Sequence, residues 1–202
     1  MIDIFATFIA FFAVVDPIGT IPVFIAATRQ IDDKLKLRIA INATIAAAGI
    51  LLFFILAGEF ILTVMSIPLS AFQISGGIVL FIFSLTMIFG ESKPDEEIRL
   101  VTDHHERAIF PLAVPSIASP GAMLTAVLLT ENARFSFIEQ AQTFIVLLTV
   151  LFITFIMMIL AGKINKIIGR SGATVISRVM GLILASVAMT NLLSGIETYF
   201  GI

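Results

Sequence analysis

The chain has 202 residues, of which 59% are hydrophobic and only 13% are charged, and its mean hydropathy is +1.11. This composition excludes a soluble domain of this size and indicates a polytopic membrane protein. The chain contains no cysteine, which excludes disulfides and thiol chemistry, and its basic residues lie in short connections that do not form a nucleic-acid surface.

Six segments are apolar over a length sufficient to cross a hydrocarbon core of roughly 30 Å, which takes about 20 residues of helix. These segments are 4–28, 37–58, 70–90, 108–130, 140–162 and 174–199. They predict an all-α fold with six transmembrane helices, in a single transmembrane domain over residues 1–202. The first segment lacks a basic region before it and a small-residue cleavage site, so we expect a retained helix and not a signal peptide.

Lysine and arginine are distributed unevenly among the connections between these segments. Of the twelve basic residues, all except Arg134 follow the first, third or fifth segment. The positive-inside rule therefore predicts that loops 29–38, 91–107 and 163–178 are cytoplasmic. Both termini are then expected outside, in a multi-pass protein of the plasma (inner) membrane.

Two segments contain helix-breaking residues in the middle of an apolar stretch. The first segment has Asp16-Pro17-Ile18-Gly19-Thr20-Ile21-Pro22, and the fourth has Pro115-Ser116-Ile117-Ala118-Ser119-Pro120-Gly121. Proline lacks the N–H that a helical turn uses, and its ring clashes with the preceding turn, so the helix is expected to be interrupted between Pro17 and Pro22. We expect both segments to be discontinuous helices.

The two halves of the chain have the same layout. Each half has a broken helix, a plain helix and a helix containing glycine, and an offset of 104 residues sets Gly77 against Gly181. Because three helices separate the copies, the second must cross the membrane in the opposite direction. The sequence thus predicts an inverted repeat, with repeat one at 1–90, the cytoplasmic loop at 91–107 and repeat two at 108–202.

A broken helix frees N–H and C=O groups that hydrocarbon cannot satisfy, so these groups must face protein or a wet cavity. The N-terminal ends of half-helices suit a substrate carboxylate, and the freed carbonyls suit an ammonium group or a cation. We therefore predict one central substrate site where the two breaks meet. Its predicted residues are Asp16, Pro17, Gly19, Thr20, Gln73, Ser119, Pro120 and Gly121.

Two of these residues have alternative interpretations. A carboxylate near the bilayer centre costs on the order of 3 kcal/mol on insertion scales, so Asp16 is expected to face away from lipid. It either carries a proton or stays ionised as a helix cap and a counter-ion for the substrate. Gln73, which precedes a glycine pair, either lines a cavity or allows close helix packing.

No metal or cofactor site is predicted, because the adjacent His104 and His105 do not share a helix face.

Four segments together resemble the MarC family of six-helix inner-membrane proteins, which includes small neutral amino-acid transporters. The segments are Asp16-Pro-Ile-Gly-Thr-Ile-Pro-Val-Phe, Phe72-Gln-Ile-Ser-Gly-Gly-Ile, Met87-Ile-Phe-Gly and Phe110-Pro-Leu-Ala-Val-Pro-Ser-Ile-Ala-Ser-Pro-Gly-Ala. The resemblance covers nearly the whole chain and implies an amino-acid transporter. Many members have Asn where Asp16 stands, which keeps a capping oxygen but cannot carry a proton, so the capping interpretation of Asp16 is favoured.

We expect a secondary active transporter of small neutral amino acids of the glycine, alanine or serine type, coupled to a proton or cation. A passive channel or an exporter of another small solute is the alternative. We do not expect an enzyme, since no Ser/His pair, paired aspartates or metal cluster lies at membrane depth. The expected partners are the amino acid, the coupling ion and the lipid bilayer, and no nucleic acid.

Overall fold

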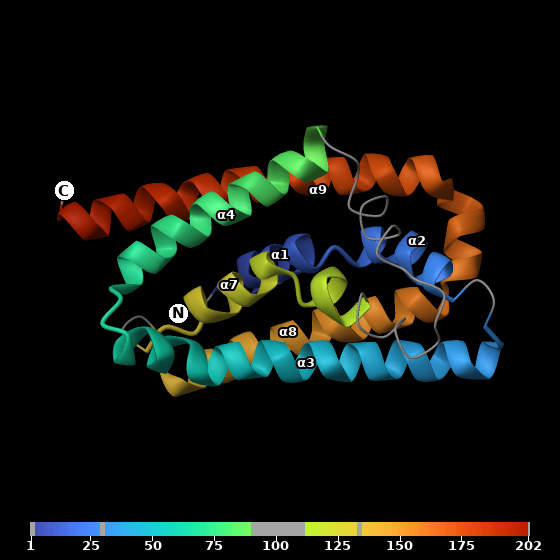
Figure 1. Ribbon diagram of the computed structural model, residues 1–202, viewed down its shortest axis with the longest axis horizontal. Coiled ribbons are helices and arrows are strands. Elements are labelled where there is room, and N and C mark those ends of the chain that lie inside the picture. Colours follow the sequence, from blue (N-terminus) through green and yellow to red (C-terminus); the bar gives the residue numbers. More distant parts are fainter. Residues whose placement is uncertain (1–2, 29–30, 90–111, 133–134, 202) are drawn as a thin grey trace.

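The computed structural model describes residues 3–28, 31–89, 112–132 and 135–201, and its regular elements in these ranges are all helical (Figure 1). The helices are α1 (Ile4–Val15), α2 (Pro17–Ala27), α3 (Asp33–Val64), α4 (Leu69–Phe89), the π-helix η2 (Leu112–Ile117), α7 (Pro120–Leu128), α8 (Phe137–Ile159) and α9 (Ala161–Phe200).

Five helical stretches within the described ranges are long and apolar enough to cross a membrane. They are Ile4–Ala27, Asp33–Val64, Leu69–Phe89, Phe137–Ile159 and Thr174–Phe200. The fold is therefore that of an all-α, polytopic membrane protein. The predicted fourth span begins at residues 108–111, which lie outside the described residues, and its described part is divided between η2 and α7. A sixth span stays a prediction.

Two of the segments predicted as cytoplasmic loops are largely helical, and their cytoplasmic location stays a prediction. α3 begins at Asp33, so most of 29–38 belongs to a helix, and α9 begins at Ala161, so 163–178 is helical apart from a bend. Charged side chains end an apolar segment without ending a helix, because the backbone hydrogen bonds continue beyond the hydrocarbon. The third predicted loop, 91–107, lies outside the described residues.

The bend in α9 lies at Gly169, whose backbone angles are φ 67° and ψ 173°. Only glycine readily adopts this conformation. The turns before the bend carry the exposed Lys163 and Lys166, and they run across one end of the molecule before the long part of α9 turns back along it (Figure 1). The bend thus separates a short basic helix from the last span.

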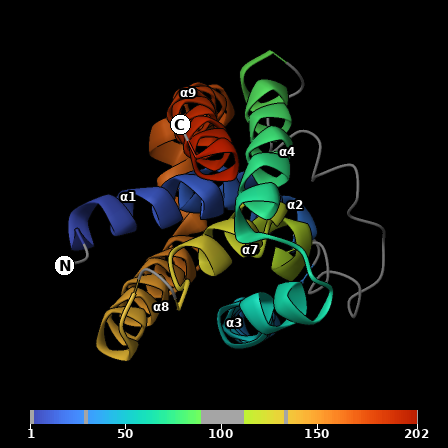
Figure 2. The ribbon, with the colours of Figure 1, turned by 90° about the vertical axis from the view of Figure 1, so that its left-hand side faces the viewer.

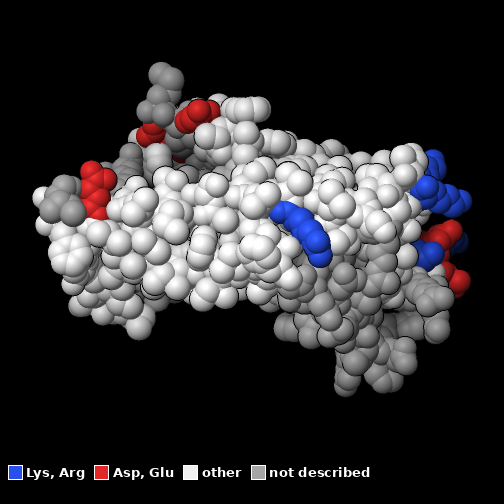
Figure 3. Space-filling model, turned by 90° about the horizontal axis from the view of Figure 1, so that it is seen from above, with Lys and Arg blue, Asp and Glu red and all other residues white. Residues whose placement is uncertain are grey.

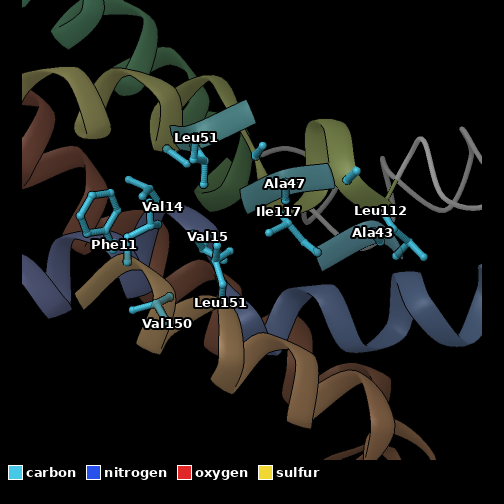
Figure 4. Close-up of a cluster of buried hydrophobic side chains, with 14 of the residues drawn as sticks. Phe11, Val14, Val15, Ala43, Ala47, Leu51, Leu112, Ile117, Val150 and Leu151 are labelled. Atoms are coloured by element: carbon cyan, nitrogen blue, oxygen red, sulfur yellow. The ribbon is translucent and has the colours of Figure 1, made fainter. Parts of the chain in front are cut away.

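The long helices form two pairs that enclose the broken ones. α4 packs along α9 on one side, α3 packs with α8 on the other, and α1, α2, η2 and α7 lie between the pairs (Figure 2). Phe11, Leu51, Ile117 and Leu151 bring α1, α3, η2 and α8 together in the buried core, and none is more than 2% exposed (Figure 4). The broken helices are thereby shielded by the packed helices around them.

The outer surface is largely apolar, as a lipid-facing surface must be. Phe53 of α3, Phe152 of α8 and Leu182 of α9 are each more than half exposed. Figure 3 shows most charged side chains near the two ends of the molecule, and the described lysines and arginines gather mainly at one end. This distribution matches a protein whose long axis crosses the bilayer.

Candidate functional site

The first helix break lies at Asp16, between α1 and α2. The backbone of Asp16 is left-handed, with φ 49° and ψ 69°, so this residue ends one helix and begins the next. Pro17 occupies the first turn of α2, where its missing N–H is not needed. The prediction of an interruption that extends to Pro22 was wrong, because Pro22 lies inside the continuous helix α2.

The carboxylate of Asp16 is 1% exposed and accepts two hydrogen bonds. The backbone N–H of Gly19 donates to Oδ1 at 2.9 Å and caps α2, and the hydroxyl of Ser177 in α9 donates to Oδ2 at 2.9 Å. Both oxygens of this buried side chain therefore have a hydrogen-bond partner. Asp16 therefore connects α2 with a helix that is 161 residues away in sequence.

The second break lies between η2 and α7, and Ser119 joins it to the first. The Ser119 hydroxyl accepts from the backbone N–H of Ala122 at 3.1 Å and so caps α7. The same hydroxyl donates to the carbonyl oxygen of Val14, in the last turn of α1, at 2.9 Å. Carbonyls at a helix end have no partner within their helix. The second break thus satisfies a backbone carbonyl that the first leaves open.

A third contact connects the two breaks. The hydroxyls of Thr20 in α2 and Ser116 in η2 lie 3.2 Å apart, and Thr20 also donates to the carbonyl oxygen of Asp16 at 3.1 Å. Both threonine and serine are fully buried. We call Asp16, Thr20, Ser116, Ser119 and Ser177 the central polar cluster.

The glycines at the breaks have no room for a side chain. A Cβ added to Gly19 would collide with the Asp16 carboxylate and with the Ser177 hydroxyl. A Cβ added to Gly121 would lie 2.6 Å from a methyl carbon of Leu80 in α4. A side chain at Gly19 would therefore have to displace the Asp16 carboxylate, and one at Gly121 would have to displace the end of the Leu80 side chain.

The structure brings together most but not all of the predicted site residues. Asp16, Thr20 and Ser119 are in the central polar cluster, and Gly19 contacts Asp16 directly. Pro17 and Pro120 hold the first turns of the capped helices, and Gly121 follows in the second of these. Gln73 is buried in α4 but has no hydrogen bond to the cluster among the described residues.

Ser116 and Ser177 complete the cluster and were not among the predicted site residues. Ser116 lies within the second break, so the break itself was a usable signal. Ser177 lies where the predicted sixth segment, 174–199, overlaps the predicted cytoplasmic stretch 163–178, and no local pattern distinguished it from other small polar residues. The described residues contain no group of three histidine, cysteine, aspartate or glutamate side chains that could hold a metal, and His104 and His105 lie outside them.

Two of the cavities among the described residues lie against the broken helices, and the residues of the central polar cluster line neither of them. A cavity of about 290 Å³ lies between α3, α4 and α7, and its walls include Pro120 and Gly121. A cavity of about 630 Å³ lies between α2, α3, α8 and α9, and its walls include Phe24 and Thr28. The cluster itself is packed closed, since no member is more than 1% exposed.

Comparison with known proteins gives a match over nearly the whole chain. The family described as MarC family integral membrane protein matches residues 1–200. The chain belongs to the MarC family. A UPF0056 membrane protein of Methanocaldococcus jannaschii is 34% identical over 94% of both chains, and one of Buchnera aphidicola is 32% identical over 99% of both. No solved structure matches the chain. The names of these MarC relatives give no substrate.

Proposed function

We propose that the chain is a secondary active transporter of small neutral amino acids of the glycine, alanine or serine type, coupled to a proton or cation. The observation that carries this proposal is the meeting of two discontinuous helices at a buried carboxylate. Asp16 and Ser119 each precede a proline, and each caps the following helix by accepting the N–H three residues on. Paired helix breaks of this kind hold substrates and coupling ions in secondary transporters.

The contacts between α4 and α9 support an inverted repeat. The offset of 104 residues relates Gly77 to Gly181 and Ser84 to Ala188. A Cβ on Gly77 would lie 3.0 Å from the carbonyl oxygen of Ala188, and a Cβ on Gly181 would lie 3.2 Å from that of Ser84. Gly181 is the counterpart of Gly77, and Ser84 is the counterpart of Ala188. The contact between Gly77 and Ala188 is therefore repeated by the contact between Gly181 and Ser84, as a two-fold axis between the halves requires.

The broken helices cross in the same reciprocal way. α1 packs against α7, and α2 packs against η2. In an inverted repeat α1 corresponds to η2, and α2 corresponds to α7. The same two-fold symmetry therefore converts the contact between α1 and α7 into the contact between η2 and α2. The central polar cluster then lies near the axis between the repeats, where inverted-repeat transporters bind their substrates.

The charge distribution supports the proposed orientation in a plasma (inner) membrane. The start of α3, which carries Lys34, Lys36 and Arg38, lies at the same end of the molecule as the start of α9, which carries Lys163 and Lys166 (Figure 1). α1 begins and α9 ends toward the other end (Figure 1). By the positive-inside rule the basic end faces the cytoplasm and the termini face outward.

The packing of the cluster favours a carrier over an open channel. A channel needs a continuous wet path, whereas Asp16, Thr20 and Ser119 are each at most 1% exposed and line neither of the two cavities beside the broken helices. We further propose that the chain is not an enzyme, because the polar groups of the cluster are engaged in joining helices.

Uptake by the purified protein in proteoliposomes tests the proposed function. Labelled glycine, alanine and serine are offered with and without an imposed pH or sodium gradient, and protein-free liposomes are the control. We expect saturable uptake that a gradient drives and that unlabelled substrate inside the vesicles accelerates. Uptake that neither saturates nor responds to internal substrate would identify a channel, and no uptake under any gradient would refute the proposal.

A further inference from the structure

The larger cavity opens at the basic end of the molecule and has both charged and apolar walls. Its volume of about 630 Å³ falls within the range of small-molecule sites. Lys36 forms an ion pair with Asp33 at 3.0 Å, and Lys166 lies on the facing wall with no ion pair among the described residues. The wall also holds Thr28 and Asn165. These groups suit a zwitterionic solute whose carboxylate is attracted to the lysines.

One face of α2 leads from this cavity to the centre of the bundle. Asp16, Thr20, Phe24 and Thr28 are four residues apart, so they follow one face of the helix at steps of about 6 Å. Thr28 and Phe24 line the cavity, whereas Thr20 and Asp16 belong to the central polar cluster. Phe24 is the apolar residue between the two polar parts of this face; it is 5% exposed, and Thr28 on the cavity side is 2% exposed.

We propose that the larger cavity is a water-filled vestibule on the cytoplasmic side and that the Phe24 side chain is the barrier between this vestibule and Asp16. The solute assigned to the vestibule, a small zwitterion, rests on the proposed function. The barrier itself rests on the position of Phe24 between Thr20 and Thr28. Movement of one buried ring would then open the central polar cluster to the cytoplasm without separating the two helix pairs.

The absence of cysteine from the chain permits a direct test by thiol labelling. Single-cysteine variants are reacted in membrane vesicles of known orientation with a charged, membrane-impermeant methanethiosulfonate. Asp3→Cys and Lys163→Cys, exposed at opposite ends, report the orientation. We expect Thr28→Cys to react from the basic side only, and faster than Ser84→Cys, which is buried between α4 and α9 and lines neither cavity.

The barrier is tested with a second set of variants. Thr20→Cys is expected to be protected, and adding Phe24→Ala should raise its reaction rate from the basic side by roughly tenfold or more, since a buried ring no longer has to move. Phe11→Ala, the same change at a fully buried ring in α1, is the matched control and should leave Thr20→Cys protected.

Three results would overturn the proposal. Thr28→Cys could be protected from both sides, or it could react only with a membrane-permeant maleimide, which would identify a lipid-filled cleft. Alternatively, Phe11→Ala and Phe24→Ala could expose Thr20→Cys equally, which would identify general loosening. Labelling reports access of water and needs no transport. A protein that labels as expected but takes up no amino acid would therefore contradict the proposed function and support the vestibule.

Discussion

The Asp16 carboxylate receives one hydrogen bond from its own helix and one from a distant helix. Gly19 is close enough in sequence for the capping role to be predicted from the Asp-Pro pattern. Ser177 could not be predicted, because no local pattern relates it to a residue 161 positions away. The sequence therefore identified the acid but not the full environment that holds it.

Asp16→Asn is expected to preserve the fold and weaken substrate binding at every pH. The asparagine oxygen still accepts from Gly19, and the Ser177 hydroxyl can rotate to accept from the new amide. Loss of the charge should raise the concentration for half-maximal uptake by roughly tenfold, since a hydrogen bond to a charged group is worth about 1.5 kcal/mol or more. Uptake measured from pH 5 to 8 checks this.

One result for Asp16→Asn would contradict the expected loss of affinity. A flat pH profile in place of a pH-dependent one, with unchanged affinity, would show that Asp16 carries a proton.

Gly19→Ala should reduce uptake by at least roughly tenfold. The added methyl group collides with the Asp16 carboxylate and must displace it from Ser177, and such overpacking typically costs about 1–3 kcal/mol. Gly49→Ala in α3 is the matched control, because nothing lies within 4 Å of the position its methyl group would take. Thermal unfolding measures the stability of both variants, and proteoliposome assays measure their uptake. Equal activity of the two would place the site elsewhere.

Among the elements, the helices themselves were predicted from hydropathy, but their ends were not. The apolar length of a segment reflects the thickness of hydrocarbon, whereas the ends of α3 and α9 depend on backbone hydrogen bonds that continue into charged sequence. Both breaks were predicted from proline. The extent of the first was overestimated, since α2 tolerates Pro22 in its interior.

Gly77→Ala and Gly181→Ala should destabilise the protein by similar amounts, about 1–3 kcal/mol each. In both, the new methyl group meets the backbone of the facing helix, α9 or α4. Gly162→Ala, with open space around it, is the control. Unfolding in detergent measures the stability of the three variants. A large loss for one interface glycine and none for the other would contradict the reciprocal packing.

At the scale of the whole molecule, the basic end and the termini are expected in opposite compartments. A reporter fused after Ile202 should be active outside the cytoplasm, and one inserted within 91–107 should be active inside it. Paired reporters, such as a phosphatase active only outside and a fluorescent protein active only inside, check both positions. Activity in the same compartment would contradict the orientation and the inverted repeat together.

The two hydrogen bonds to Asp16 become available at very different times during synthesis. Gly19 lies three residues after Asp16 and can cap it as soon as the first hairpin enters the membrane. Ser177 emerges 161 residues later, which at about 5–20 residues per second is a delay on the order of 10 to 30 s. During that interval the carboxylate has only its local cap. The helix break that shapes the centre of the finished protein therefore supplies the acid with its first partner long before the distant helix is made.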